Sequence, residues 1–237
     1  MDIPIAALFA VVIAVFVLIR LLVSKRGRPA DIEASHLANF MTTRRFAQIK
    51  VSDHRLGPVL AAFRVAAEDD ALVSSGTYAE TAFIDQRGRI LCKIFTVAPD
   101  ADGRSYSLIL ALPWPVNEPD WTWVNLPRLP EFGLTLVKRM LSLSLNISGL
   151  KPVSRSSPPA ARANAYEALY STEGRLPGAL AHALFSQLAD KSLILRKAKA
   201  CLVVELKDLL STRDDASEAL CLLETGDLVS TMPDLRA

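Results

Sequence analysis

Few residues in this chain have the types and the spacing that catalysis requires. Ser148 and Lys151 match a Ser-x-x-Lys pattern, in which a lysine amine activates a serine hydroxyl as a nucleophile. The pair falls in a predicted turn before Pro152, away from any predicted helix start. The sequence contains no dinucleotide, phosphate-binding, metalloprotease or nucleophile-elbow motif. We therefore predict no catalytic residue and a protein that is not an enzyme.

Metal-binding side chains are dispersed along the sequence. His36, His54 and His182 show no metal-ligand spacing. The carboxylate clusters 68–70 and 214–215 lie beside predicted helix ends, where acidic side chains are ordinary. We predict no metal site and no cofactor. A hydrolase or transferase would require a cleft that joins a carboxylate or a serine to His182 or His54.

Cysteine usage indicates a reducing compartment. The chain has three cysteines, Cys92, Cys201 and Cys221, an odd number with no CxxC pair, and each lies in an apolar run. A disulfide framework is therefore not expected.

The most distinctive segment, residues 113–130, contains five prolines and all three tryptophans. Tryptophan is enriched at interface hot spots and proline keeps a loop rigid, so we predict partner binding by Trp114, Trp121 and Trp123. Contact with a membrane interface, or stacking on a sugar or nucleotide, is also compatible with these side chains. In the structural alternative, Trp121 and Trp123 lie two apart on one face of a short strand and fill the core.

The N-terminal segment predicts a membrane anchor. Residues 3–23 are apolar apart from Arg20, and 21 helical residues span about 31 Å, close to the thickness of a bilayer core. The basic cluster after them places the N-terminus outside and the C-terminal domain in the cytoplasm of a single-pass inner-membrane protein. The predicted anchor residues are Ile3, Phe9, Phe16, Arg20, Lys25, Arg26 and Arg28, and Ala6, Ala10 and Ala14 form a small-residue face for helix packing.

The charge balance argues against a nucleic-acid partner. The chain has 27 basic and 25 acidic residues, and 23 basic and 24 acidic ones remain without Asp2, Arg20 and the three basic residues that follow the anchor. A nucleic-acid-binding domain normally carries a basic face and a net positive charge. The predicted partners are the lipid bilayer and other membrane proteins of a larger complex.

Periodicity predicts helices first and strands after them. A helix over about residues 29–48 and a second one from Leu56 form a juxtamembrane segment, 25–75. Runs at 77–84, 90–98 and 105–112 predict an antiparallel meander, and a short strand follows at 121–125. These strands belong to a β-rich lobe, 76–150, in which residues 131–148 fit either a helix or a strand.

A second lobe, residues 161–237, is predicted after a linker at 151–160. Its pattern is strand, helix, strand, strand, helix, at 166–170, 177–189, 193–196, 200–206 and 214–228, and Thr212 or Asp214 is expected to cap the last helix. The predicted fold class is therefore α+β: a transmembrane anchor (1–24) followed by a cytosolic domain of two packed lobes.

Two short motifs carry a resemblance. The sequence LPEFGL at 129–134 is followed by YEALYSTE at 166–173, a helix, the hairpin SLILRKAKACLVVEL and a final helix. This order resembles a loose group of uncharacterised bacterial membrane-anchored proteins with a cytosolic α+β domain, over about residues 76–230. The resemblance implies no reaction, ligand or catalytic residue.

These patterns favour a non-enzymatic accessory or assembly subunit of a bacterial inner-membrane complex, whether respiratory, photosynthetic, secretory or part of the envelope. The alternative is a membrane-tethered domain that binds a small ligand between its two lobes, near Trp114 and Trp123.

Overall fold

A computed structural model of the chain describes residues 30–63, 76–97, 104–114, 118–127, 150–153, 166–175, 177–207 and 214–232. The chain divides into two units, Met1–Asn39 and Phe40–Ala237. Helix α2 (Ala30–Thr43) begins in the first unit and ends in the second, which contains all of the described strands. The candidate site is built entirely within the second unit.

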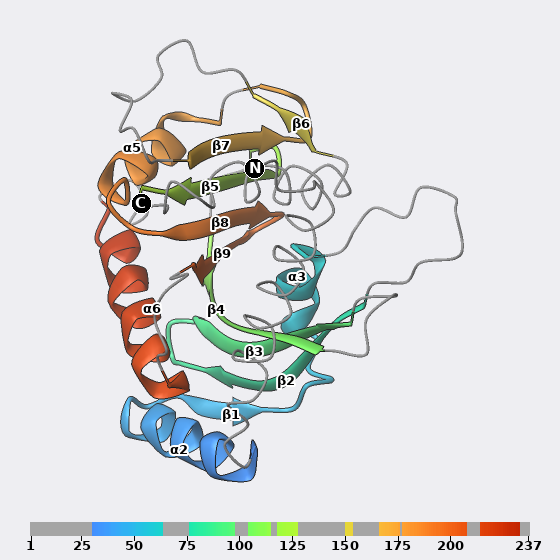
Figure 1. The fold of residues 1–237 in the computed structure, drawn as a ribbon, viewed down its shortest axis with the longest axis vertical. Helices are drawn as coiled ribbons and strands as arrows, with labels where there is room; N and C mark the ends of the chain where they lie inside the picture. Colours follow the sequence, from blue (N-terminus) through green and yellow to red (C-terminus); the bar gives the residue numbers. More distant parts are fainter. Residues whose placement is uncertain are drawn as a thin grey trace, which may run out of the picture. The chain divides into compact units, whose positions relative to one another are not determined.

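One antiparallel sheet of nine strands forms the centre of this unit (Figure 1). The strand order across the sheet is β1-β2-β3-β4-β9-β8-β5-β7-β6, and every neighbouring pair is antiparallel. The strands are β1 (Ala47–Ile49), β2 (Gly76–Ile84), β3 (Ile90–Val97), β4 (Arg104–Pro113), β5 (Trp121–Leu126), β6 (Lys151–Pro152), β7 (Tyr166–Ser171), β8 (Leu193–Ala198) and β9 (Cys201–Leu206).

The predicted meander is confirmed as β2, β3 and β4. The turn between β2 and β3 is stabilised by Asp85, whose carboxylate accepts the backbone N–H groups of Arg87 and Arg89 at 2.9 Å each. Gly88 has a φ of +77°, a left-handed conformation that glycine adopts without strain. This tight turn brings β2 back along β3 with Ile84 opposite Ile90.

The two predicted lobes are a single sheet, so the predicted α+β fold class is wrong. Strand β4 of the first predicted lobe pairs with β9 of the second, and β5 lies between β7 and β8. All residues from Leu108 to Leu112, and from Cys201 to Val204, are buried. Strands that are apolar on both faces are central strands, and each therefore requires neighbours on both sides. That requirement joins the two halves into one mainly β structure.

Helices cover both faces of the sheet. Helix α3 (Leu56–Ala61) packs on a cluster that includes Cys92, Ile109 and Val203. Successive side chains of a strand point to opposite faces, so Leu110 lies on the other face of β4 from Ile109. There it contacts α6 (Asp215–Ser230), which approaches so closely that a β-carbon added at Gly226 would lie 2.5 Å from Leu110 Cδ2.

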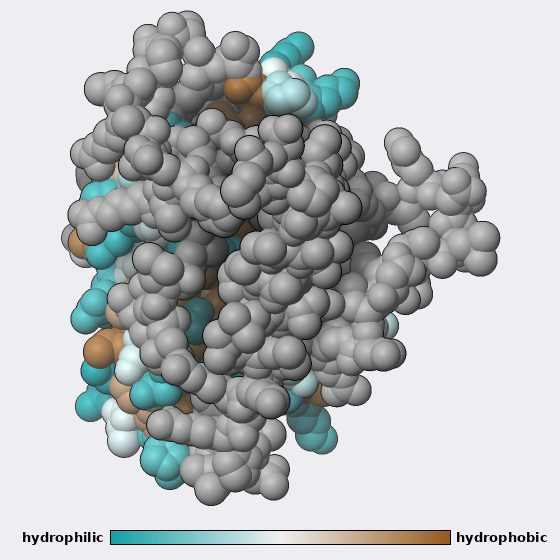
Figure 2. Space-filling model, viewed as in Figure 1, coloured by the Kyte–Doolittle hydropathy of each residue, from teal (hydrophilic) through white to brown (hydrophobic). Residues whose placement is uncertain are grey.

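Helix α6 runs along the sheet beside β4 and β9 (Figure 1). Asp214 caps its first turn by accepting the N–H of Ser217 at 2.8 Å, which confirms one of the two predicted caps. Figure 2 shows that the described surface along this helix is mainly hydrophilic, with single hydrophobic residues between. The remaining helix, α5 (Ala179–Gln187), packs over β5.

The described residues do not support the predicted membrane-spanning helix. Within the described ranges, no helix is both long and apolar enough to cross a membrane. The longest, α2 and α6, have 14 and 16 residues, so they reach about 21 and 24 Å, short of a bilayer core. The predicted anchor, residues 3–23 with its basic flank, and the ambiguous segment 131–148 lie outside the described residues. Nothing in the described part of the chain supports the predicted single-pass inner-membrane localisation, which is withdrawn.

Candidate functional site

The three tryptophans lie in the core. Trp114 follows β4, Trp121 and Trp123 are on β5, and each of these residues is 1% exposed. Phe185 of α5 packs edge-on against Trp121 at 5.2 Å between centroids, and stacks on Trp123 at 4.6 Å. This packing agrees with the structural alternative for Trp121 and Trp123. Contact of the Trp/Pro segment with a partner stays a prediction, and these rings offer almost no surface for it.

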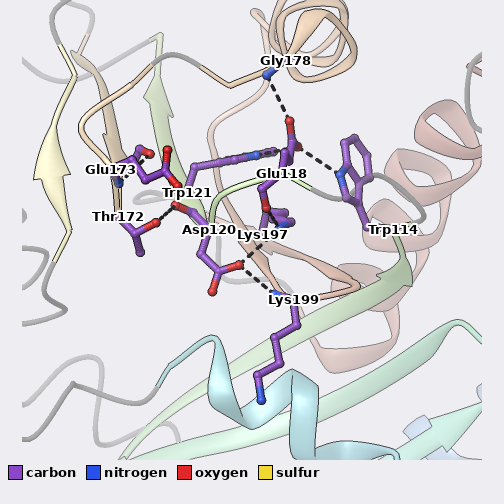
Figure 3. A network of polar contacts seen from close by, with 10 residues as sticks. Trp114, Glu118, Asp120, Trp121, Thr172, Glu173, Gly178, Lys197 and Lys199 are labelled. Carbon is purple, nitrogen blue, oxygen red and sulfur yellow. Dashed lines mark hydrogen bonds and ion pairs between the residues drawn. The ribbon is translucent and has the colours of Figure 1, made fainter.

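The carboxylate of Glu118, in the segment that connects β4 to β5, accepts the indole N–H groups of two tryptophans (Figure 3). Glu118 Oε1 accepts from Trp114 Nε1 at 3.1 Å and from Trp121 Nε1 at 2.8 Å. Glu118 Oε2 accepts the backbone N–H of Gly178, the N-cap residue of α5, at 3.0 Å. One side chain thus satisfies two buried indoles and fixes the start of the helix that packs on them.

Asp120 and Lys197 complete the network (Figure 3). Lys197, which is 3% exposed, donates to the backbone carbonyl of Glu118, and its Nζ lies 3.3 Å from Asp120 Oδ1. The same Asp120 oxygen accepts the backbone N–H of Lys199 at 2.8 Å, and the Asp120 carbonyl accepts that of Thr172 at 3.0 Å. These groups attach the loop to β7 and β8, so their role is structural.

A second buried charge, Glu205, lies on the opposite face of the sheet. Its Oε1 is 2.5 Å from Lys207 Nζ, and its Oε2 is 3.6 Å from Arg196. Burial alone would raise the pKa of Glu205. The charges of Lys207 and Arg196, with hydrogen bonds from Lys207 and Ser107, instead lower that pKa to about 2. The carboxylate is therefore an ionised structural anchor, a state opposite to that of a general acid.

Three aromatic side chains form a row across β2, β3 and β4. Tyr78 stacks on Phe95 at 5.4 Å between centroids, and Phe95 lies 6.0 Å from Tyr106. The two tyrosines are 52% and 46% exposed. Lys93 Nζ lies 5.6 Å from the centroid of the Tyr106 ring. We call Tyr78, Phe95 and Tyr106 the aromatic row; nothing in our sequence interpretation singled them out.

A pocket of about 210 Å³ opens beside the aromatic row, at the N-terminus of α6. Lys93 reaches across it to Asp215 at 2.7 Å and to Glu80 at 3.7 Å. The pocket is lined by Lys93, Tyr106, Ser107, Leu108, Leu206, Lys207, Asp215 and Glu218. Charged groups of both signs therefore surround it.

The other candidate chemical groups do not converge. His54 is exposed beside Asp53, and His182 lies against Phe185 on α5. Burial raises the pKa of the Cys92 and Cys201 thiols to about 12, so both remain protonated. Within the described ranges, no three His, Cys, Asp or Glu side chains are grouped as metal ligands. Ser148 and the cluster at 68–70 lie outside those ranges.

Comparisons with known proteins give one distant structural likeness. No protein-family model matches the chain, and no curated protein matches it. The crystal structure of the mycobacterial trehalose monomycolate transport factor A, TtfA, is similar at 12% identity and a TM-score of 0.41, over 84% of this chain and 94% of that chain. A likeness of this size carries no argument about function, so the candidate site stands on its own geometry.

Proposed function

We propose that this chain is a non-enzymatic accessory subunit that binds a partner protein through the aromatic row. The observation that carries the proposal is the exposure of Tyr78 and Tyr106 on one stacked row. Tyrosine combines a large apolar ring with a polar hydroxyl and is enriched at interface hot spots. Stacking through Phe95 holds the rings in place before a partner arrives, which lowers the entropic cost of binding.

The surroundings of the row also support a binding surface. Lys93 holds its ammonium near the Tyr106 ring and is tied to Asp215, so a charged rim borders the exposed rings. An aromatic centre with a polar rim is the usual composition of a protein interface. The other two exposed large hydrophobic side chains of the described surface, Val51 and Leu228, lie outside the row and serve as controls.

A capture experiment tests this function. The tagged full chain, the double variant Tyr78→Ser/Tyr106→Ser and the control Leu228→Ser are each used as bait, and retained proteins are quantified by mass spectrometry. We expect one set of partners, in constant ratio to the bait, to be retained by wild type and by Leu228→Ser. At least a tenfold loss is expected with the double variant.

Circular dichroism and thermal melting must first show that all three baits are folded. Equal retention by the double variant and wild type, or recovery of the bait alone, contradicts the proposed function.

A second candidate function is binding of a small ligand in the pocket beside the row. Lys93, Lys207, Asp215 and Glu218 offer both signs of charge, which suits a zwitterion of amino-acid size. The volume of about 210 Å³ is below the usual range for ligand pockets, about 300–1,000 Å³. A concentration-dependent rise in the melting temperature with free amino acids would favour this candidate.

A further inference from the structure

Part of strand β2 has an open edge. Along one side, β2 pairs with β3 from Gly76 to Ile84. Along the other, β1 pairs only with Ala82, Phe83 and Ile84. Among the described residues, no strand pairs with the outer edge of β2 between Gly76 and Glu80. Such an edge presents backbone N–H and C=O groups that another strand can use.

The open stretch has few of the features that normally protect an edge. Proteins block exposed edges with lysine, proline or bulges. The residues from Gly76 to Ala79 include neither lysine nor proline, and the bulge comes only afterwards, where the register shifts between Ala79 and Thr81. The bulge and β1 thus mark one end of a short site, and no described strand occupies the rest of it.

The open stretch also carries the end of the aromatic row. Tyr78 is the row's outermost ring, because β2 is the last of the three strands toward this edge. A strand added outside β2 would place a side chain directly beside Tyr78 on the same face. Such cross-strand neighbours lie about 4.5–5.5 Å apart and favour aromatic and β-branched side chains.

The charges around this edge define the chemistry of its occupant. The charged side chains beside the row and in the adjoining pocket are Glu80, Asp215 and Glu218 against Lys93 and Lys207, so carboxylates outnumber ammonium groups by three to two. Glu80 is 37% exposed and lies at the bulge, next to the open stretch. A basic side chain on an incoming strand would complement this surface.

We infer that the partner contributes an extended, basic segment that adds to the sheet as a strand along Gly76–Glu80, with an aromatic or β-branched side chain beside Tyr78. This inference rests on the proposed function, because it specifies how the partner occupies the same surface. Main-chain hydrogen bonds to β2 supply affinity, and alternate side chains of the segment supply specificity.

Peptides test the mode of binding. Overlapping 12-residue peptides that span the captured partner are titrated against the full chain by fluorescence anisotropy. We expect one basic peptide with alternating apolar residues to bind. A copy N-methylated at its central amides keeps the side chains but cannot donate, and we expect it to bind at least tenfold more weakly.

Variants of this chain locate the site. Tyr78→Ser and Glu80→Lys are each expected to weaken the peptide about tenfold, whereas Glu224→Lys, the same charge change on the exposed side of α6, is expected to leave it unchanged. Hydrogen–deuterium exchange of the complex should slow at the backbone amides of residues 76–80. Equal binding of the N-methylated copy, or protection only elsewhere, overturns strand addition.

The two proposals fail in different ways. Partner capture that is lost with the tyrosines, but reproduced by no linear peptide, refutes strand addition and leaves the accessory function standing. Partner capture that is equal for wild type and the double tyrosine variant refutes the accessory function itself. Sedimentation of the pure chain as a dimer that Tyr78→Ser dissociates would assign the edge to a second copy and overturn the inference.

Discussion

Glu205 is a charged residue that is almost completely buried. It is 4% exposed, yet the ammonium of Lys207 and the guanidinium of Arg196 keep it ionised. Removing one member of a buried ion pair leaves uncompensated charge and is strongly destabilising. Because Lys207 is one-third exposed, water recovers part of that cost. Neutralising the Glu205 carboxylate is therefore expected to lower the stability of the fold, but by less than breaking a fully buried ion pair would.

We predict that Glu205→Gln lowers the free energy of unfolding by roughly 2–3 kcal/mol near neutral pH. The pKa of Glu205 is lowered from 4.5 to about 2, so its contribution is complete above its unfolded pKa and is lost as pH falls toward 2. Urea unfolding at several pH values should therefore show the difference between wild type and variant shrinking with acidification. A constant difference across that range would contradict the role assigned to the ionised carboxylate.

The aromatic row could not be predicted from the sequence, because it depends on which residues of neighbouring strands lie opposite each other. The β2–β3 turn was predicted correctly, and pairing Ile84 with Ile90 without interruption would place Ala79 opposite Phe95. The bulge at Glu80 shifts the register by one residue and brings Tyr78 there instead. No pattern in the sequence announces that bulge. The burial of Trp121 and Trp123, by contrast, agrees with the structural alternative that their two-residue spacing offered beside partner binding.

At the scale of elements, α6 can contact β4 closely because residue 226 is a glycine, which has no side chain. Gly226 is buried where Leu110 approaches, whereas Gly57 of α3 has no atom within 4 Å of an added β-carbon. Gly226 lies in the interior of α6, where alanine gains about 1 kcal/mol in helix propensity, whereas Gly57 lies in the first turn of the short helix α3, where the gain is smaller. The two substitutions therefore compare a helical glycine in open space with one that is tightly packed.

We predict that Gly57→Ala stabilises the fold by up to about 1 kcal/mol, and that Gly226→Ala destabilises it by about 1 kcal/mol after its propensity gain is offset by overpacking. Thermal melting of the two variants beside wild type measures both effects. Stabilisation by both substitutions would show that α6 can move away from the sheet without cost.

Element type and order were largely predictable, because local patterning specifies them. The meander, β5, the β8–β9 hairpin and the helices α5 and α6 fall within a few residues of their predicted positions. The pairing of β4 with β9 was missed, although both are continuous apolar runs of the kind found in central strands. Periodicity reports which faces of a strand are buried, but it does not identify the neighbouring strand.

For the whole molecule, one continuous sheet predicts cooperative unfolding. The three tryptophans report on β5 and its neighbours, whereas far-UV circular dichroism reports on all strands. Because β4–β9 pairing joins the two halves, we predict that both signals follow a single urea transition with one midpoint. Two separated midpoints would restore the two-lobed organisation that the sequence suggested.

The β4–β9 pairing also constrains the order of events during synthesis. Strands β1 to β4 leave the ribosome before the other strands, but Ile109 of β4 pairs with Glu205 of β9, which is made much later. Until then, β4 has apolar residues on both faces and an unpaired side, which is a surface prone to aggregation. Pairing over so long a separation is also slow. The nascent chain should therefore depend on chaperones until β9 emerges.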